Sequence, residues 1–455
     1  MEYPGTKFTR PIRLSLLLFF IAAFFIIAPL LILYTAGYRY DWYNGLFNET
    51  GAISIDILPK NATVHVNGLR LKGKMPIRLK NITPGRYDLR LTAPEYHDWQ
   101  KTVEVKNQET LYLKDIQMMQ QNKPVLLNKG AIKNIWLSPN GRFLLYVVTT
   151  VEENKIFLRD NSAHTVTFLT DLPKNLEPHV TWAKENNYVA LYTLPAPYEI
   201  VLLVDASEPS NSPLDLTKKI PSITKVQWLD VAQPEIYIAN QSTTSSVYRF
   251  AVATGELTPI PLSTYADWSL EGTSLWAITL NTSTRQWILL RDALHTKNNF
   301  LPLKDAGGAV SPQPGWELLT AYQGQALVKE RGHEEIKIVA SETIFPVLAD
   351  TFFLSPYNNW LLLWSPHELW TYTIGEEPRL LNRSGERLMQ VVPLDNNNTL
   401  ALRWSDKVTV LFPYYLISHE FINGQLTALA VNSEERIAYF NGSIDGEEGL
   451  WQLTY

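Results

Sequence analysis

The stretch from residue 124 to residue 455 repeats one pattern of short apolar strands. In each repeat an apolar strand and a polar turn are followed, six to nine residues later, by a second apolar strand, then by a third and often a fourth. Trp136, Trp182 and Trp228 mark the first strands of three successive repeats and lie 46 residues apart. Repeats of about 40–45 residues with about four strands each are typical of a β-propeller, in which every repeat forms one blade. The pattern therefore predicts an all-β protein built around such a ring.

The pattern occurs eight times, which predicts eight blades within residues 119–455. Their first strands are centred on Trp136, Trp182, Trp228, Trp268, Trp316, Phe353, Val391 and residues 426–430. The fifth repeat is the least regular, so a seven-bladed ring is one alternative, and a pair of β-sandwiches is another. Segment 124–130 (PVLLNKG) precedes the first repeat without a repeat of its own, whereas the last repeat shows only three strands. We expect this segment to complete the last blade and so to close the ring.

An uninterrupted apolar run, residues 14–34, precedes the repeats and contains no charged side chain. About 20 apolar helical residues, each rising about 1.5 Å, are enough to cross the hydrocarbon core of a bilayer. Lys7, Arg10 and Arg13 lie before the run, and such positive flanks stay on the cytoplasmic side, which puts the folded mass in the cell envelope. The predicted order is a cytoplasmic tail over residues 1–13, a transmembrane helix over 14–36 and a juxtamembrane linker over 37–50.

A cleaved signal peptide is the alternative to a retained anchor. The apolar segment of a signal peptide usually spans about 7–15 residues, and the longer run found here favours the anchor. The sequence Thr35-Ala36-Gly37 after the run still admits a signal peptidase, so the alternative stays open.

Composition excludes several classes of function. The net charge of −5 argues against a nucleic-acid-binding surface, which is usually basic. Cysteine is absent, so the chain has neither disulfides nor thiolate chemistry.

Residues 51–118 alternate apolar and polar side chains with a period of two. This alternation is typical of strands with one buried face, as at Ile53, Ile55 and Ile57. Asn67 and Gly68 form a dipeptide that favours a tight hairpin turn. About six short antiparallel strands with turns between them predict a small β-sandwich.

The same residues resemble the PEGA domain, whose pattern contains V-x-V-N-G, G-x-x-P and P-G-x-Y. The matching residues are Pro59, Ala62, Val64, Val66, Asn67, Gly68, Gly73, Pro76, Pro84, Gly85 and Tyr87. Two residues depart from the pattern. Asn61 replaces a glycine and is expected to adopt positive φ in its place, and Glu95 replaces the glycine before Tyr96. The resemblance implies an extracytoplasmic accessory module, common on bacterial surface proteins, without catalytic residues.

A second resemblance lies in the first repeat. Ser138-Pro139-Asn140-Gly141 resembles the S-P-D-G turn of TolB-like propellers, with Asn140 in place of the usual aspartate, and residues 355–360 form a weaker copy. The Gly-His and Trp-Asp pairs of WD40 repeats are missing. The resemblance supports the propeller fold, and Asn140-Gly141 is interpreted as a type I′ hairpin turn, not as a binding site.

The motifs of common catalytic, metal and cofactor sites are missing. The histidines do not occur at metal-ligand spacings, and the chain lacks G-x-S-x-G, a P-loop and G-x-G-x-x-G. Ser222 and Lys225 match S-x-x-K, but they lead into a strand, whereas β-lactamase-type sites carry this motif on a helix. We therefore predict no catalytic residue, no metal ligand and no cofactor, and hence a protein that is not an enzyme.

Carboxylates near the first strands leave one catalytic alternative open. These residues are Asp230, Asp267, Glu317 and Asp350. A propeller brings its first strands to a common centre, where two carboxylates could act as acid and base on a glycoside. Solvated loop carboxylates are the simpler interpretation. The tryptophans at the repeated position are interpreted as blade core and not as sugar-stacking platforms.

These features together predict a single-pass membrane protein anchored in the lipid bilayer. The propeller is expected to engage an envelope protein or an envelope polysaccharide, and not nucleic acid. A glycan-acting enzyme and a purely structural envelope protein are the alternatives, because fold alone is a weak guide to function.

Overall fold

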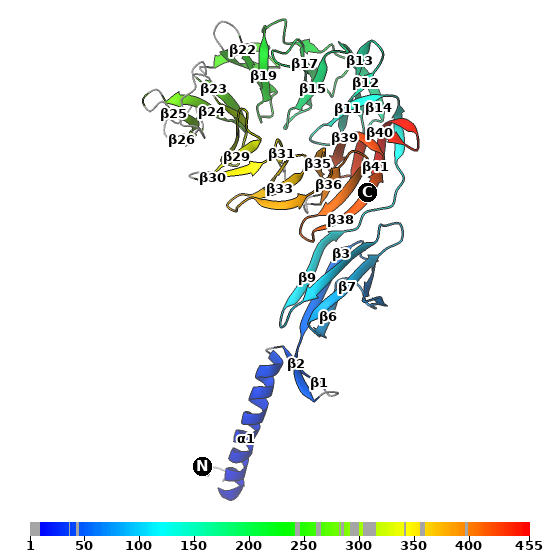
Figure 1. Cartoon of the computed structure of the whole chain (residues 1–455), viewed down its shortest axis with the longest axis vertical. Helices are drawn as coiled ribbons and strands as arrows, with labels where there is room; N and C mark the ends of the chain where they lie inside the picture. The colour runs from blue at the N-terminus through cyan, green and yellow to red at the C-terminus, as the bar shows by residue number, and fades with distance from the viewer. Residues whose placement is uncertain are drawn as a thin grey trace, which may run out of the picture. The chain divides into compact units, whose positions relative to one another are not determined.

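The structure is a computed structural model of the chain, drawn in Figure 1. It divides into two compact units, one ending at Asn122 and the other running from Lys123 to Thr454. The described residues are 10–35, 37–41, 45–241, 246–260, 265–281, 283, 286–291, 300–303, 315–340, 343–354, 360–395 and 399–455.

Helix α1 (Arg10–Thr35) occupies the apolar run. Its first described residue, Arg10, lies before the predicted start at residue 14, and Pro11 fits there because a proline is tolerated in the first turn of a helix. The predicted end at residue 36 lies outside the described residues. Pro29 lies inside the helix, which a membrane-spanning helix tolerates. By length and composition, Pro11–Thr35 is apolar enough to cross a membrane.

The predicted juxtamembrane linker over residues 37–50 contains regular structure. Strand β1 (Tyr38–Asp41) pairs antiparallel with β2 (Leu46–Glu49). The Tyr38 hydroxyl donates a hydrogen bond to Glu49 Oε1 at 2.7 Å, across the ends of the two strands. The segment is therefore a hairpin, which the sequence analysis did not predict.

Residues 51–117 form two small sheets with apolar side chains between them. One sheet has the order β6-β3-β9 and the other the order β5-β4-β7-β8. Ile53, Ile55 and Ile57 of β3 are completely buried, as the predicted alternation requires. The strands are β3 (Gly51–Leu58), β4 (Thr63–Val66), β5 (Leu69–Arg70), β6 (Ile77–Ile82), β7 (Gly85–Thr92), β8 (Trp99–Val105) and β9 (Thr110–Gln117).

Two details of this sandwich differ from prediction. Strand β9 pairs parallel with β3, because the chain crosses through the other sheet before it returns, and only such a crossover allows parallel neighbours. Asn61 does not adopt the positive φ expected of it, and the turn is instead closed by the hydrogen bond from Ala62 N to the Pro59 carbonyl at 3.0 Å. Asn67 and Gly68 do adopt positive φ, as the predicted hairpin turn requires.

The second unit consists of four-stranded antiparallel sheets, the blades, and its described residues form eight of them, not seven. Blade 1 consists of β11 (Ile132–Leu137), β12 (Phe143–Thr149), β13 (Glu153–Asp160) and β14 (Thr165–Pro173). Blade 2 consists of β15 (Glu177–Trp182), β16 (Tyr188–Leu194), β17 (Val201–Asp205) and β18 (Leu214–Asp215). Blade 3 consists of β19 (Ile223–Trp228), β20 (Glu235–Asn240), β21 (Ser246–Ala251) and β22 (Glu256–Ile260). Blade 4 consists of β23 (Tyr265–Glu271), β24 (Ser274–Asn281), β25 (Gln286–Leu290) and β26 (Phe300–Leu303).

The remaining blades follow the same plan. Blade 5 consists of β27 (Trp316–Tyr322), β28 (Gln325–Glu330), β29 (Glu335–Ala340) and β30 (Thr343–Leu348). Blade 6 consists of β31 (Thr351–Leu354), β32 (Trp360–Trp364), β33 (Glu368–Thr373) and β34 (Arg379–Arg383). Blade 7 consists of β35 (Gln390–Pro393), β36 (Leu400–Arg403), β37 (Lys407–Phe412) and β38 (Ile417–Asn423). Blade 8 consists of β39 (Gln425–Asn432), β40 (Ile437–Ile444), β41 (Glu447–Thr454) and β10 (Val125–Lys129).

The blades follow one another around a ring, as Figure 1 shows. The first strand of each blade lies nearest the centre, and β39 of the last blade contacts β11 of the first. Trp228, Trp268 and Trp316 of these inner strands are buried, whereas Trp136 and Trp182 are partly buried and pack against the core between blades 1 and 2.

Strand β10 closes the ring. It pairs antiparallel with β41 as the outermost strand of blade 8, with Val125 opposite Gln452 and Lys129 opposite Gly449. This is the pairing predicted for segment 124–130. The chain thus begins and completes its propeller in the same sheet, and blade 8 has as many strands as its neighbours.

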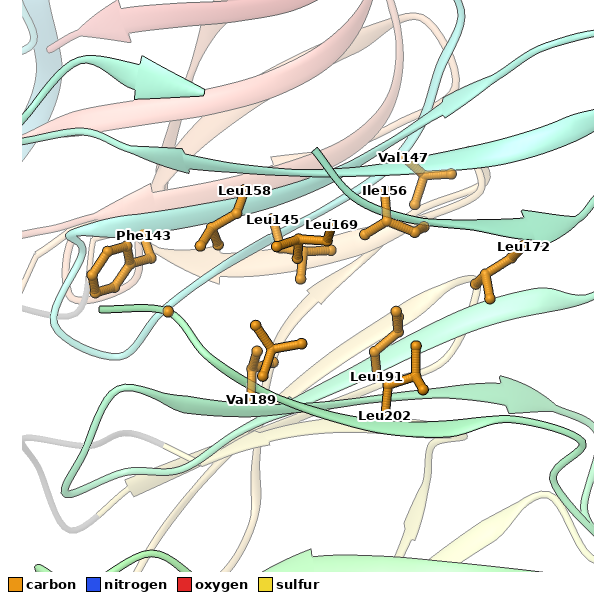
Figure 2. Packing of buried hydrophobic residues seen from close by; sticks show 12 residues of the cluster. Phe143, Leu145, Val147, Ile156, Leu158, Leu169, Leu172, Val189, Leu191 and Leu202 are labelled. Atoms are coloured by element: carbon orange, nitrogen blue, oxygen red, sulfur yellow. The ribbon is translucent and has the colours of Figure 1, made fainter. Parts of the chain in front are cut away.

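Apolar clusters join consecutive blades. Figure 2 shows one of them, in which Phe143, Leu145 and Leu158 of blade 1 face Val189 and Leu191 of blade 2. Similar clusters span the junctions between blades 2 and 3, 3 and 4, 4 and 5, 5 and 6, 6 and 7, and 8 and 1. Each blade therefore buries its apolar faces against its neighbours and depends on them for stability.

We predict that a methyl group at Gly449 weakens the closure. A Cβ there would lie 2.4 Å from the Asn128 carbonyl oxygen and 2.4 Å from Leu126 Cδ1, both on β10. Gly449→Ala should lower the free energy of unfolding by about 1–3 kcal/mol, as overpacking does. The measurement is thermal unfolding of the full chain in detergent. Gly385→Ala is the control, because its Cβ would meet no atom within 4 Å. Equal melting temperatures for the two variants would contradict the prediction.

Candidate functional site

One face of the propeller is hollowed into a cavity of about 750 Å³. The face is the one on which the first strand of each blade turns into the second, and we name it the first-turn face. Blades 1 to 8 contribute, in order, Asn140, Lys184, Asp230, Gly272, Gln323, Leu354, Asp395 and Ser433 to the cavity wall. Because every blade contributes, the cavity depends on a closed ring.

The charge of this cavity is predominantly negative. Asp230, Glu271, Asp395 and Glu434 line it, whereas Lys184 is the one cationic side chain among the described lining residues. Lys184 Nζ lies 3.3 Å from Asp230 Oδ2 and partly neutralises it. A concave site lined by one sign of charge attracts groups of the opposite sign, which here are cations.

Glu271 holds two neighbouring blades together. Its Oε1 accepts a hydrogen bond from Gly324 N of blade 5 at 2.7 Å, and its Oε2 accepts one from Trp276 Nε1 at 2.9 Å. Both carboxylate oxygens are therefore engaged in holding the wall. On the same wall, burial raises the pKa of Tyr322, whose phenol stays neutral at pH 7.

The four carboxylates selected from the sequence do not come together. Of the four, Asp230 alone lines the cavity. Asp267 is used inside the ring, because its Oδ1 accepts from Lys225 Nζ at 2.9 Å and its Oδ2 accepts from Leu318 N at 2.8 Å. Glu317 and Asp350 are exposed and lie outside the cavity.

The lysine of the S-x-x-K match, Lys225, has a structural role. Lys225 spans from blade 3 to blade 4, donating to Asp267 and to the Trp268 carbonyl. Ser222 precedes β19.

The described His, Asp and Glu side chains include no group of three that could hold a metal ion.

The predicted turn in blade 1 forms part of the first-turn face, but its type differs. Gly141 N donates to the Ser138 carbonyl at 2.9 Å, so Pro139 and Asn140 are the central residues. Gly141 has a φ of 71° while Asn140 does not have positive φ, which excludes the predicted type I′ turn. Pro139 explains the difference, because its ring fixes φ near −65°. The weaker copy at residues 355–360 lies, except for Trp360, outside the described residues.

Neighbouring first turns are linked side by side. Asn140 Nδ2 donates to Asn187 Oδ1 of blade 2 at 3.1 Å. On its other side, Gly141 lies so close to Asn432 of blade 8 that a Cβ would come within 2.2 Å of Asn432 Nδ2. These contacts hold the first turns of blades 8, 1 and 2 together.

Two glutamines join the inner strands of adjacent blades through hydrogen bonds from their side-chain amides to the backbone. Gln227 Nε2 donates to the Leu270 carbonyl at 3.2 Å, and Gln227 Oε1 accepts from Leu270 N at 3.1 Å. Gln390 makes the equivalent pair with Leu429 of blade 8, at 2.8 and 3.1 Å. Each side-chain amide thus pairs with the free edge of the next inner strand as another strand would.

Arg403 supports the second of these amide pairs. Its Nε donates to Gln390 Oε1 at 3.2 Å, and its Nη1 donates to the Leu426 carbonyl at 2.9 Å. Burial lowers the pKa of this guanidinium from its usual value. Neither glutamine nor Arg403 was predicted from the sequence, although Gln390 and Arg403 are the polar residues of otherwise apolar strands and Gln227 lies between Val226 and Trp228.

Comparison with known proteins identifies one part of the chain. Residues 50–121 match the PEGA domain, which confirms the resemblance predicted for residues 51–118. No curated protein matches the chain.

Several solved propellers are similar to the second unit. The β-propeller domain of Myceliophteria thermophila Cps50 (Swd1) has 10% identity and a TM-score of 0.42, covering 73% of this chain and 99% of that one. The Dos1 propeller has 11% identity and a TM-score of 0.45, covering 72% and 94%. The propeller of the Trilobed protease from Pyrococcus furiosus has 9% identity and a TM-score of 0.39, covering 62% and 93%. Likenesses this distant carry no argument about ligand or activity.

We predict that the glutamine pairs contribute measurably to stability. Gln227→Ala and Gln390→Ala each remove both hydrogen bonds to the backbone of the neighbouring inner strand and leave that N–H and C=O without their side-chain partner. The first variant also removes the acceptor of Ser269, and the second that of Arg403 Nε. Each variant should lose about 1–3 kcal/mol of unfolding free energy, the usual cost of leaving such groups unpaired. Denaturant unfolding of the full chain in detergent measures it. Gln286→Ala, at an exposed strand position, is the control and should stay within about 0.5 kcal/mol of the parent. If the Gln227 variant is as stable as this control, the amide pair has no such role.

Proposed function

We propose that this chain is a membrane-anchored binding protein whose propeller holds a protein partner at the first-turn face. The observation that carries the proposal is the cavity to which every blade contributes and in which four carboxylates face one lysine. The linked turns around its rim keep the surface pre-formed, which lowers the ordering cost of binding. A basic segment of a partner protein fits this charge, whereas an anionic envelope polymer is disfavoured.

Hydrolysis of a glycan is the less supported alternative. It requires two carboxylates that are free to act on opposite sides of the scissile bond. Glu271 uses both oxygens to hold Gly324 and Trp276, and Asp230 is paired with Lys184. Asp395 Oδ1 accepts a hydrogen bond from Thr399 N at 2.9 Å, so at least three of the four lining carboxylates are already engaged, which supports binding over catalysis.

Three features support the anchor. Helix α1 is long and apolar enough to span a bilayer, its side chains are exposed almost throughout, and Arg10 and Arg13 flank its N-terminal end. The PEGA match agrees with a location outside the cytoplasm. We infer that the N-terminus is cytoplasmic and that both folded units are extracytoplasmic.

Fractionation and peptide mapping test the anchor. The chain should remain in the membrane pellet after alkaline carbonate extraction, because α1 is held by the hydrophobic effect and not by charge. Mass spectrometry of the purified chain should recover peptides from within residues 10–35. A soluble mature chain that begins near residue 36 would show that the helix is a cleaved signal peptide.

Charge reversal on the first-turn face tests the partner site. Full-length protein is cross-linked in its native membrane, and cross-linked proteins are identified by mass spectrometry. Replacing Asp230 and Glu434 together by lysine should reduce recovery of the partner about tenfold or more, since each charge reversal adds repulsion against a basic segment. The matched control replaces Glu317 and Asp350, the exposed carboxylates outside the cavity, by lysine. Equal recovery with both double variants would exclude this face as the partner site.

A further inference from the structure

A second hollow lies at the junction between the first and last blades, next to the closing strand. Its volume is about 280 Å³, and we name it the seam pocket. Tyr146, Phe157 and Arg159 of blade 1 line it, together with Leu127 and Leu450 of blade 8. No lining residue is shared with the first-turn face.

Aromatic rings form one wall of the seam pocket. Tyr146 stacks on Phe157 with ring centroids 5.5 Å apart, and Phe157 meets Phe168 edge to face at 5.7 Å. Phe168 and the lining residue Val166 are each 48% exposed. The wall therefore continues from the buried core to the protein surface and leaves apolar area uncovered.

The charged groups of the pocket are cations. Lys155 and Arg159 line it, and no carboxylate is among the described lining residues. Lys155 Nζ is paired with Glu153 Oε1 at 3.1 Å. Arg159 forms no ion pair with any residue that the structure describes, and its Nε is buried without a hydrogen-bond partner. A buried guanidinium N–H is costly unless it pairs with a hydrogen-bond acceptor.

The neighbouring tyrosines do not supply that charge. Arg159 acts electrostatically on Tyr146 and on Tyr439, and would by itself lower the pKa of both. Burial outweighs this effect and raises the pKa of Tyr146. Burial, with a smaller contribution from the charge of Glu435, raises the pKa of Tyr439 to about 12. Both phenols are therefore neutral at pH 7 and give Arg159 no negative charge to pair with.

We propose that the seam pocket binds a carboxylate carried on a small apolar group. The guanidinium of Arg159 offers the paired N–H donors that fit a carboxylate, and the ring wall accepts the apolar part. The volume lies just below the range of about 300–1,000 Å³ typical of drug-sized ligands, so the occupant is one residue or one small acid in size. A free aromatic acid and the C-terminal residue of a peptide share this chemistry.

A ligand titration of the full chain in detergent tests the proposal. The probes are 3-phenylpropionate and its neutral counterpart 3-phenylpropanol, followed by isothermal titration calorimetry. N-acetyl-Gly-Phe and its C-terminal amide form a second pair, which distinguishes a peptide terminus from a free acid. In at least one pair the carboxylate should bind about tenfold or more tightly than its neutral counterpart, because an ion pair at Arg159 is lost in the latter. The pair whose acid binds more tightly shows whether the ligand is a free acid or the C-terminus of a peptide.

Variants connect the binding to Arg159. Arg159→Gln should weaken binding of the carboxylate about tenfold or more, whereas Arg159→Lys, which keeps the charge without the fork of donors, should weaken it less. Arg249→Gln is the matched control, because Arg249 also lies on the third strand of a blade but is paired with Glu235 at 2.6 Å. It should leave binding unchanged.

The melting temperature of each variant separates loss of the site from loss of the fold. Arg159→Gln should melt no lower than the parent, because it removes an unpaired charge. Three results would overturn the proposal: neither carboxylate binds the parent chain, acid and neutral probe bind equally, or a folded Arg159→Gln protein binds like the parent.

Discussion

The pairing of β10 with β41 is the contact on which the rest of the propeller depends. It places Val125 opposite Gln452 and completes the last blade with the strand that comes first in the propeller's sequence. Leu127 of β10 packs against the apolar cluster that Leu144 and Tyr146 of blade 1 form with Tyr439 and Leu450 of blade 8. The cavity on the first-turn face needs the same closure, because all eight blades form its wall.

Features that repeat along the chain could be predicted, and features set by single contacts could not. The spacing of Trp136, Trp182 and Trp228 defined the blades, and segment 124–130 was recognised as the closing strand because it belonged to no repeat. The parallel pairing of β3 with β9 escaped prediction, since alternation of apolar residues is the same in parallel and antiparallel strands at a sheet edge. The turn at Asn140 was assigned from one dipeptide, whereas the preceding Pro139 determines its type.

The candidate site was predictable only in part for a related reason. Proximity to a first strand says that a residue is near the ring centre, but not at which end of the strand or on which side it lies. Asp230 follows its strand and reaches the cavity, whereas Asp267 lies within its strand and is bonded to Lys225 and Leu318. Gln227 could have been noticed as a polar residue among apolar neighbours. The missing partner of Arg159 becomes visible only when the elements packed around it are known.

The position of β10 in the sequence also has a consequence for how the protein is made. During synthesis β10 emerges before any blade, yet its partner β41 is the last strand to appear. Until then β10 and the growing row of blades each present an unpaired edge and apolar surface, and pairing between segments so distant in sequence is slow. Long-lived intermediates of this kind aggregate readily. The propeller must therefore remain an open ring until β41 has been made, and its strand edges need shielding during that interval.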